Sequence, residues 1–285
     1  MSLKDLLVYV DDTEAALLRL NLAVDLACRH GSHLTVLYVR ELSPDQLHEL
    51  SSAELGLASA EQLDQLNRRL EASIDRAAAP LKSTLQTLEK AYHLKTEWRF
   101  VKGWASVAAL QHARYVDLSI LGHGLDGNSV RYSFSEQLLF VAGRPILLIP
   151  TAGSFSALGR HIVVAWNSSR PATRAVNDAL ALIERADRTT VLVVNPTEFI
   201  GRYNAPPLEW LVEHLRRHGA HADVVRLENI PAGSIGDALQ AEARALGADL
   251  VVAGAFGHPK VWEKLLGGVT RDLLARMTLP ILMSH

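Results

Sequence analysis

Residues 5–39 read DLLVYVDDTEAALLRLNLAVDLACRHGSHLTVLYV, and residues 161–194 repeat the same order of features as HIVVAWNSSRPATRAVNDALALIERADRTTVLVV. Each stretch predicts a strand, a short polar turn, an amphipathic helix and a second strand. The ends of the two halves repeat as well, because VDLSILG at 116–122 matches ADLVVAG at 248–254. Similarity that keeps its order at both ends of both halves indicates an internal duplication.

The duplication predicts two domains of ordinary size. We expect the first over residues 1–150 and the second over residues 161–285, because TAGSFSALGR at 151–160 is small, polar and glycine-containing, as linkers are. The first domain closes with RPILLIP and the second with LPILMSH. An apolar terminal strand left open would invite aggregation, so we expect 146–149 to pair with 281–284 in an internal pseudo-dimer. Whether two chains then form a homodimer stays open.

The fold class follows from the apolar runs. Residues 6–10, 34–39, 118–121 and 146–149 are continuously apolar rather than alternating, which is typical of parallel strands covered on both faces. Helical segments between them predict right-handed crossovers. The sequence therefore predicts an α/β protein with two tandem doubly wound parallel-sheet domains. We expect one or two helices within 44–88 and a shorter helical stretch within 198–218.

Composition limits the classes of function. The chain of 285 residues is 48% hydrophobic and carries 29 basic against 31 acidic residues, which gives no electrostatic footprint for nucleic acid or an anionic membrane. No apolar run is long enough to cross a bilayer, and the N-terminus lacks the pattern of a secretory signal. The single cysteine, Cys28, cannot form an internal disulfide. We therefore expect a cytoplasmic protein.

A glycine-rich loop is the most informative motif of the second half. Residues 254–270 read GAFGHPKVWEKLLGGVT, directly after an expected strand and before an expected helix. In open parallel sheets, ligands bind beyond the carboxyl ends of the strands. Glycines let backbone N–H groups close on a phosphate, and a helix N-terminus adds unpaired donors. The spacing of Gly254, Gly257 and Gly267 suits a diphosphate or triphosphate.

This loop resembles the ATP-binding pattern of the universal stress protein family, which is Gly-x2-Gly-x9-Gly followed by Ser or Thr. The resemblance to tandem bacterial members covers nearly the whole chain and is weakest between residues 43 and 95. It implies that ATP or a related adenine nucleotide binds the second domain, with the base against the ends of its first two strands. The contact residues that it implies are Ala165, Trp166, Asn167, Val194, Ala253, Gly254, Gly257, His258, Gly267, Gly268, Val269 and Thr270.

Two positions depart from the family pattern. Gly268 stands where the pattern has Ser or Thr, with Thr270 two positions on. Asn167 replaces the acidic residue that usually ends the first strand, and an amide can still hydrogen-bond a ribose or a base. It gives up the charge that would hold a divalent cation, which argues against a requirement for Mg²⁺. The histidines show no metal-ligand spacing either, so we expect no metal site.

The first domain departs further. Leu125 stands where the second glycine should be, and Tyr132 aligns with Gly267 when the two halves are matched at Pro145 and Pro280. The loop is also shorter, with 23 positions from Gly122 to the proline against 26 in the second half. We expect this half to have lost its nucleotide. Asp11 is then a turn or cap residue for the helix that begins near Glu14.

The sequence favours a stress-response binding module rather than an enzyme. Nothing in the glycine loop supplies an obvious base, so we expect at most weak ATPase activity. Ser168 and Ser169 lack the context of a nucleophile and are better interpreted as a helix N-cap. Two alternatives stay open: a structural dimerisation protein in which neither half binds nucleotide, and an enzyme similar to the ATP pyrophosphatases.

Overall fold

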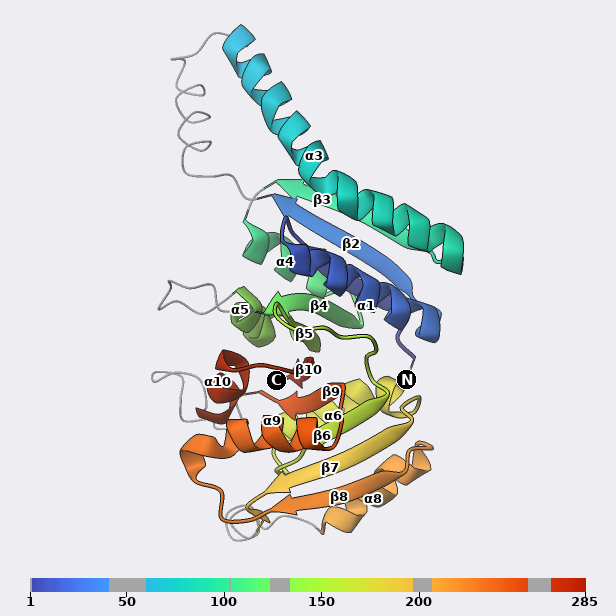
Figure 1. The fold of residues 1–285 in the computed structure, drawn as a ribbon, viewed down its shortest axis with the longest axis vertical. Coiled ribbons are helices and arrows are strands. Elements are labelled where there is room, and N and C mark those ends of the chain that lie inside the picture. The colour runs from blue at the N-terminus through green and yellow to red at the C-terminus, as the bar shows by residue number, and fades with distance from the viewer. Residues whose placement is uncertain (1, 41–59, 103, 124–133, 197–206, 256–267) are drawn as a thin grey trace.

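The computed structural model describes residues 2–40, 60–102, 104–123, 134–196, 207–255 and 268–285, in which strands and helices alternate (Figure 1). The elements of the first half are β1 (Asp5–Val10), α1 (Glu14–His30), β2 (His33–Arg40), α3 (Ala60–Tyr92), β3 (Thr96–Lys102), α4 (Ala105–Ala113), β4 (Leu118–His123), α5 (Phe134–Val141) and β5 (Ile146–Pro150). Those of the second half are β6 (His161–Ala165), α6 (Arg170–Ile183), β7 (Arg188–Val194), α8 (Leu208–Arg217), β8 (Ala222–Leu227), the 3₁₀ turn η2 (Ala232–Ser234), α9 (Ile235–Ala245), β9 (Leu250–Gly254), α10 (Gly268–Ala275) and β10 (Ile281–Ser284).

All these strands belong to a single sheet with the order β3-β2-β1-β4-β5-β10-β9-β6-β7-β8. Pairs within each half are parallel, as the continuous apolar runs predict. The halves join through β5 and β10, which pair antiparallel with Ile281 opposite Leu148 and Met283 opposite Ile146. This is the pairing expected of the two closing strands. The prediction of two tandem doubly wound parallel-sheet domains is confirmed.

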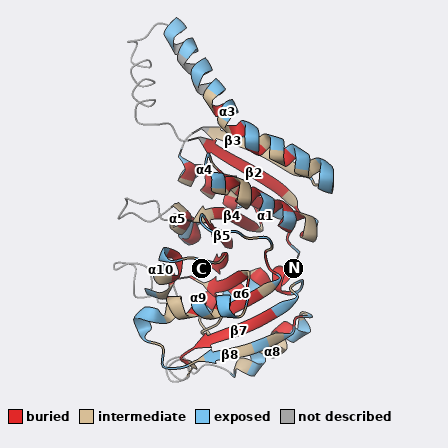
Figure 2. Cartoon of the chain, in the orientation of Figure 1, coloured by how far each residue is buried: buried red, intermediate tan, exposed pale blue. Residues whose placement is uncertain are grey.

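Two hydrophobic layers cover the two faces of the sheet. On one face, α1, α3, α6 and α8 pack over the strands, and on the other face α4, α5, α9 and α10 do so. Figure 2 shows the strands as the most buried part of the chain and the outer surfaces of the helices as exposed. Corresponding helices of the two halves therefore share a face. The crossovers leave the carboxyl ends of the parallel strands of each half at one edge.

The main difference between the halves is the helix that follows their second strand. The first half has α3, of 33 residues, whereas α8 has 10. Figure 1 shows that α3 bends midway, and Pro80 within it removes a helical hydrogen bond. The helix predicted within 44–88 is confirmed from residue 60 onward, and residues 41–59 lie outside the described part. Within that part, no helix has the length and apolar character needed to cross a membrane.

Polar contacts tie the halves together on both faces. Arg174 Nη2 donates to the carbonyl of Gly143 at 2.9 Å, and His123 Nε2 lies 3.1 Å from the carbonyl oxygen of Leu274. Near the end of α1, Arg185 donates to the backbone carbonyl of Arg29. These bonds add to the strand pairing, so the two halves meet through side chains as well as through the sheet.

His30, at the end of α1, is a buried histidine beside these contacts. The residue is 7% exposed, and its Nε2 has no hydrogen-bond partner among the described residues. Burial, followed by the nearby cations Arg185 and Arg29, lowers the pKa of His30 from 6.5 to about 4. The folded protein therefore keeps this imidazole neutral at pH values at which the unfolded chain protonates it.

We predict that acidification from about pH 7 to about pH 5 lowers the free energy of unfolding by roughly 1 to 2 kcal/mol through His30 alone. Because the folded pKa lies below the unfolded one, stability is fully present above the unfolded pKa and falls as the pH drops toward the folded one. Urea denaturation of the natural protein and of His30→Gln at both pH values measures this. Equal pH dependence in the two proteins would contradict the prediction.

Candidate functional site

The carboxyl ends of β6, β7 and β9 meet at one edge of the second half. Ala165 lies opposite Leu192 and Ala253 in the parallel registers, and the N–H of Trp166 donates to the carbonyl of Leu192 at 2.9 Å. Val194 ends β7 at the same edge. The structure therefore brings together four of the residues that the sequence assigns to the nucleotide site: Ala165, Trp166, Val194 and Ala253.

The turn from β6 to α6 is built by short polar side chains. Asn167 Oδ1 accepts a hydrogen bond from the N–H of Ser169 at 3.2 Å, and Ser168 adopts a left-handed conformation with φ 56°. The hydroxyl of Ser169 accepts a hydrogen bond from the N–H of Ala172 at 3.3 Å, which confirms Ser169 as the helix N-cap. Asn167 thus uses its oxygen in the turn, and its Nδ2 makes no hydrogen bond to a described residue.

Gly254 permits a close approach of backbones at the end of β9. A Cβ placed on Gly254 would lie 2.3 Å from the nitrogen of Ala172 and 2.5 Å from the carbonyl carbon of Pro171, in the first turn of α6. No side chain fits there. The first glycine of the predicted loop therefore has a structural requirement of its own, whether or not a phosphate binds beside it.

The remaining predicted residues lie at the start of α10 or before it. Gly257, His258 and Gly267 fall outside the described residues. The helix α10 begins at Gly268, and a Cβ there would meet no atom of a described residue within 4 Å. Val269 is half-buried and Thr270 is 5% exposed. Thr270 is therefore buried in the protein, whereas Gly268 has open space beside it.

Asn195 is a residue whose role the sequence did not reveal. It is 4% exposed and follows β7 in a left-handed conformation, with φ 49°. Its Nδ2 donates to the carbonyl of Ile230 at 2.7 Å, and its Oδ1 accepts from the N–H of Ile230 at 3.0 Å. These two hydrogen bonds tie the end of β7 to the segment that leads into η2. The turn η2 in turn contacts α10. An Asn directly after an apolar strand is the signal that could have suggested it.

Arg19 fills the corresponding crevice of the first half. Arg19 is 1% exposed. Its Nε donates to the carbonyl of Tyr9 at 2.7 Å, and its Nη2 lies 3.1 Å from Asp11 Oδ2. Burial lowers the pKa of the Arg19 guanidinium below its ordinary value, and Asp11 opposes this shift. A Cβ on Gly122, at the end of β4, would lie 2.2 Å from Arg19 Nη1. The guanidinium thus sits between β1 and β4, where the strand order reverses.

Among the described residues of the second half, the position that matches Arg19 holds no cation. When the halves are matched through their strand registers, Arg19 corresponds to Ala175, Asp11 to Asn167 and Gly122 to Gly254. In place of an arginine, the first turn of α6 touches Gly254 directly. The ends of β4 and β9 are therefore packed against the neighbouring helix in different ways.

Asp11 has the turn role that the sequence predicts and a second role that it does not. Its Oδ1 accepts the N–H of Thr13 at 3.1 Å, just before α1 begins at Glu14. Its Oδ2 carries the ion pair to Arg19. Leu125 and Tyr132, which predict loss of the nucleotide in this half, lie outside the described residues. Within the described ranges, no three His, Cys, Asp or Glu side chains cluster as metal ligands would.

Comparisons with known proteins agree with this architecture. The model of the universal stress protein family matches residues 2–141 and 159–285. A solved universal stress protein from Archaeoglobus fulgidus is 17% identical, over 98% of this chain and 97% of that chain, with a TM-score of 0.70. A functionally unknown protein from Pseudomonas aeruginosa is 17% identical, over 99% of this chain and 92% of that one, with a TM-score of 0.56. No curated protein shows a significant match.

The class is therefore a pair of tandem, doubly wound α/β domains that share one sheet. The family match spans both halves, and the two solved structures cover nearly the whole chain with the same fold. The chain belongs to the universal stress protein family.

We predict that Asp11→Asn lowers the free energy of unfolding by about 2 to 3 kcal/mol, because it leaves the buried guanidinium of Arg19 without a counter-charge while the amide still supports the turn. The reverse exchange at the matched position, Asn167→Asp, faces no buried cation among the described residues and should change stability by less than about 0.5 kcal/mol. Urea denaturation measures both. An equal cost in the two variants would show that the ion pair stabilises nothing.

A second prediction separates the two glycines by their surroundings. Gly254→Ala should cost about 2 to 3 kcal/mol, because its Cβ would press on the backbone of α6. Gly268→Ala should be neutral or stabilise α10 by up to about 1 kcal/mol, because its Cβ meets open space. Thermal and urea unfolding of the two variants decide the matter. The expectation is wrong if Gly254→Ala is as stable as Gly268→Ala.

Proposed function

We propose that this protein binds ATP or a related adenine nucleotide in its second domain and uses the bound nucleotide as a regulatory signal in a stress response. The spacing of Gly254, Gly257 and Gly267 carries the proposal, because this chain belongs to the universal stress protein family, whose ATP-binding pattern has that spacing. The domains proposed are residues 1–150 and 161–285, and the proposed contacts are those that the sequence implies. We place the protein in the cytoplasm, without a nucleic acid or membrane partner.

The arrangement around the loop supports this site. Ala165, Trp166 and Val194 end their strands at the same edge, where a base could lie against them. The helix α10 begins at Gly268, directly after the third glycine in the sequence, and the N-terminus of a helix favours an anion. In the first half, Arg19 already occupies the crevice between β1 and β4. We therefore propose one nucleotide for each chain.

We further propose that the protein is a binding module rather than an enzyme. Around the described part of the site, Asn167 is the side chain at the position of the usual acidic residue, and its oxygen is engaged by Ser169. An amide is neither a general base nor a strong ligand for Mg²⁺. Hydrolysis would then be slow, and nucleotide occupancy rather than turnover would be the signal.

Titration calorimetry with ATP tests the proposal. We predict one site per chain, and a loss of affinity of at least about tenfold in Gly257→Arg and in Gly267→Tyr, since each would place a side chain in the phosphate cradle. The absence of ATP binding in the natural protein would favour the structural dimerisation alternative. Steady release of AMP or ADP at enzymatic rates would favour the enzyme alternative.

A gain of affinity tests the same site from the other direction. Gly268→Ser restores the residue type of the family pattern where a Cβ has open space, so we predict that it tightens ATP binding about threefold to tenfold through one added hydrogen bond. Gly268→Ala is the matched control and should bind ATP as the natural protein does. Equal affinity of the Ser and Ala variants would show that no phosphate reaches this position.

A further inference from the structure

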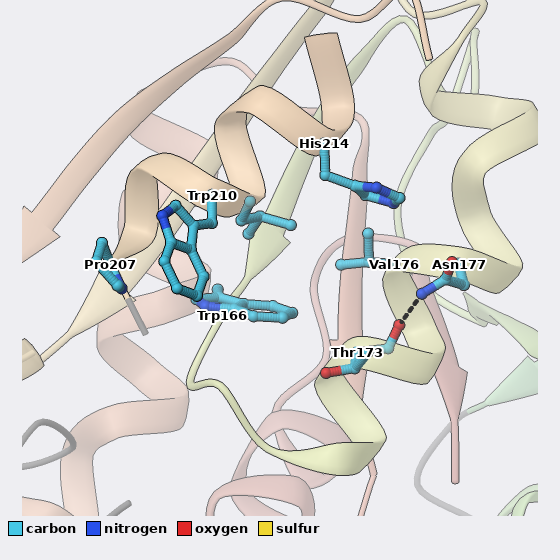
Figure 3. A pocket seen from close by; sticks show the side chains of 8 residues that line it. Trp166, Thr173, Val176, Asn177, Pro207, Trp210 and His214 are labelled. Carbon is cyan, nitrogen blue, oxygen red and sulfur yellow. Dashed lines mark hydrogen bonds between the residues drawn. The ribbon is translucent and has the colours of Figure 1, made fainter. Parts of the chain in front are cut away.

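A hollow of about 310 Å³ lies between α6 and α8, on the outer face of the second half. Its floor is apolar and consists of Trp166, Val176 and Leu211, of which Val176 is 2% exposed and Leu211 is 8% exposed. Figure 3 shows the indoles of Trp166 and Trp210 at one end of the hollow and the side chains of His214 and Asn177 at the other. The volume lies at the lower end of the range for small-molecule sites in proteins.

In the first half, a longer helix covers the corresponding place. There α1 packs directly against α3, which buries Ile74, Ala78, Leu81 and Leu85. In the second half, α6 and α8 make few contacts with each other. The space is thus a consequence of a short α8, and an apolar floor that one half covers with its own leucines is left open in the other.

An exposed tryptophan stands at the rim of this hollow. Trp210 is 68% exposed, although tryptophan is among the side chains that gain most from burial. It lies in the first turn of α8, next to Pro207, and its ring stands above that of Trp166 in Figure 3. Two indoles beside an apolar floor form a surface on which a flat ring can stack.

The polar groups of the hollow are few. Asn177 Nδ2 donates to the carbonyl of Thr173 at 2.8 Å, which fixes the amide and leaves Oδ1 without a partner among the described residues. His214 contributes a ring that packs edge-on against His218, with 4.8 Å between ring centroids. Among the described residues that line the hollow, there is no carboxylate, lysine or arginine. Buried charge on a ligand would therefore go uncompensated, whereas one N–H donor could be satisfied.

We propose that this hollow is a second binding site, separate from the glycine loop, for an uncharged planar heteroaromatic ring that carries an N–H donor. The ring stacks between Trp166 and Trp210 over Val176 and Leu211, and its N–H donates to Asn177 Oδ1. The site shares Trp166 with the proposed nucleotide contacts, but no described residue of the glycine loop lines it, so it does not rest on the proposed nucleotide function.

Indole is the probe that tests the proposal. Titration of the full chain with indole, followed through the indole N–H signals of the tryptophans in ¹H–¹⁵N spectra, should shift the signals of Trp166 and Trp210 and leave that of Trp104 in place. We expect a dissociation constant between about 10 μM and 1 mM, as suits a small ligand with few heavy atoms. The absence of any shift at about 5 mM indole would overturn the proposal.

Two variants locate the site, and each has a matched control variant in the first half. Trp210→Ala should weaken indole binding at least about tenfold, whereas Trp104→Ala, which removes an equally exposed tryptophan (70%), should not change it. Asn177→Phe should fill the rim and abolish binding. Asn21→Phe is its control, since Asn21 is the exposed counterpart that makes the same 2.8 Å bond, to the carbonyl of Leu17. All four positions are exposed, so the variants should fold.

The nucleotide loop supplies the last comparison. Gly257→Arg should leave the affinity for indole unchanged while it weakens ATP, and Trp210→Ala should do the reverse. The proposal is overturned if Gly257→Arg abolishes indole binding, because the ring would then occupy the nucleotide site, or if Trp210→Ala and Asn177→Phe bind indole as tightly as their controls. Failure of ATP binding alone leaves these expectations for indole in force and contradicts only the proposed function.

Discussion

The antiparallel pairing of β5 with β10 is the interaction on which the rest of the structure depends. Ile281 lies opposite Leu148 and Leu282 opposite Leu147, so two apolar edge strands that would otherwise be exposed satisfy each other's backbone groups. An antiparallel join also decides which helices share a face, and it places α1, α3, α6 and α8 together over one hydrophobic layer. The contacts between Arg174 and Gly143 and between His123 and Leu274 join the same two halves beside this pairing.

Within this common frame, the ends of β4 and β9, at the reversal of strand order, are packed in different ways. In the first half, a buried ion pair between Arg19 and Asp11 takes the space beside Gly122. In the second half, the backbone of α6 itself reaches Gly254. A buried guanidinium costs desolvation even with one partly exposed partner, so removal of that partner leaves a buried charge and is expensive.

Most of the fold could be predicted from the sequence, because it depends on local patterns that occur twice. The apolar runs, the repeated turn after the first strand and the paired closing strands each indicate one element and its neighbours, and Ser169 could be identified as a cap from its place before Arg170-Pro171. For the nucleotide site, the sequence could predict which strand ends lie together but not the side-chain contacts around them. Arg19 lies in an apolar helical pattern, and nothing in that pattern says whether its side chain points to solvent or under the sheet. The partner of Asn195 is 35 residues away, and the hollow beside Trp210 arises from the difference in length between α3 and α8, so neither could follow from a local pattern.

The covalent link between the halves has an evolutionary consequence. In an assembly of two identical chains, every substitution appears twice, and a change that suits one site must be tolerated in the other. Here each half is encoded separately, and the partner strand is always at hand because it belongs to the same polypeptide. An arginine at position 19 and an alanine at position 175 can then coexist in one molecule. Because the halves are fused, their two sites can change independently. One half can then serve as a scaffold while the other half remains free to acquire ligands.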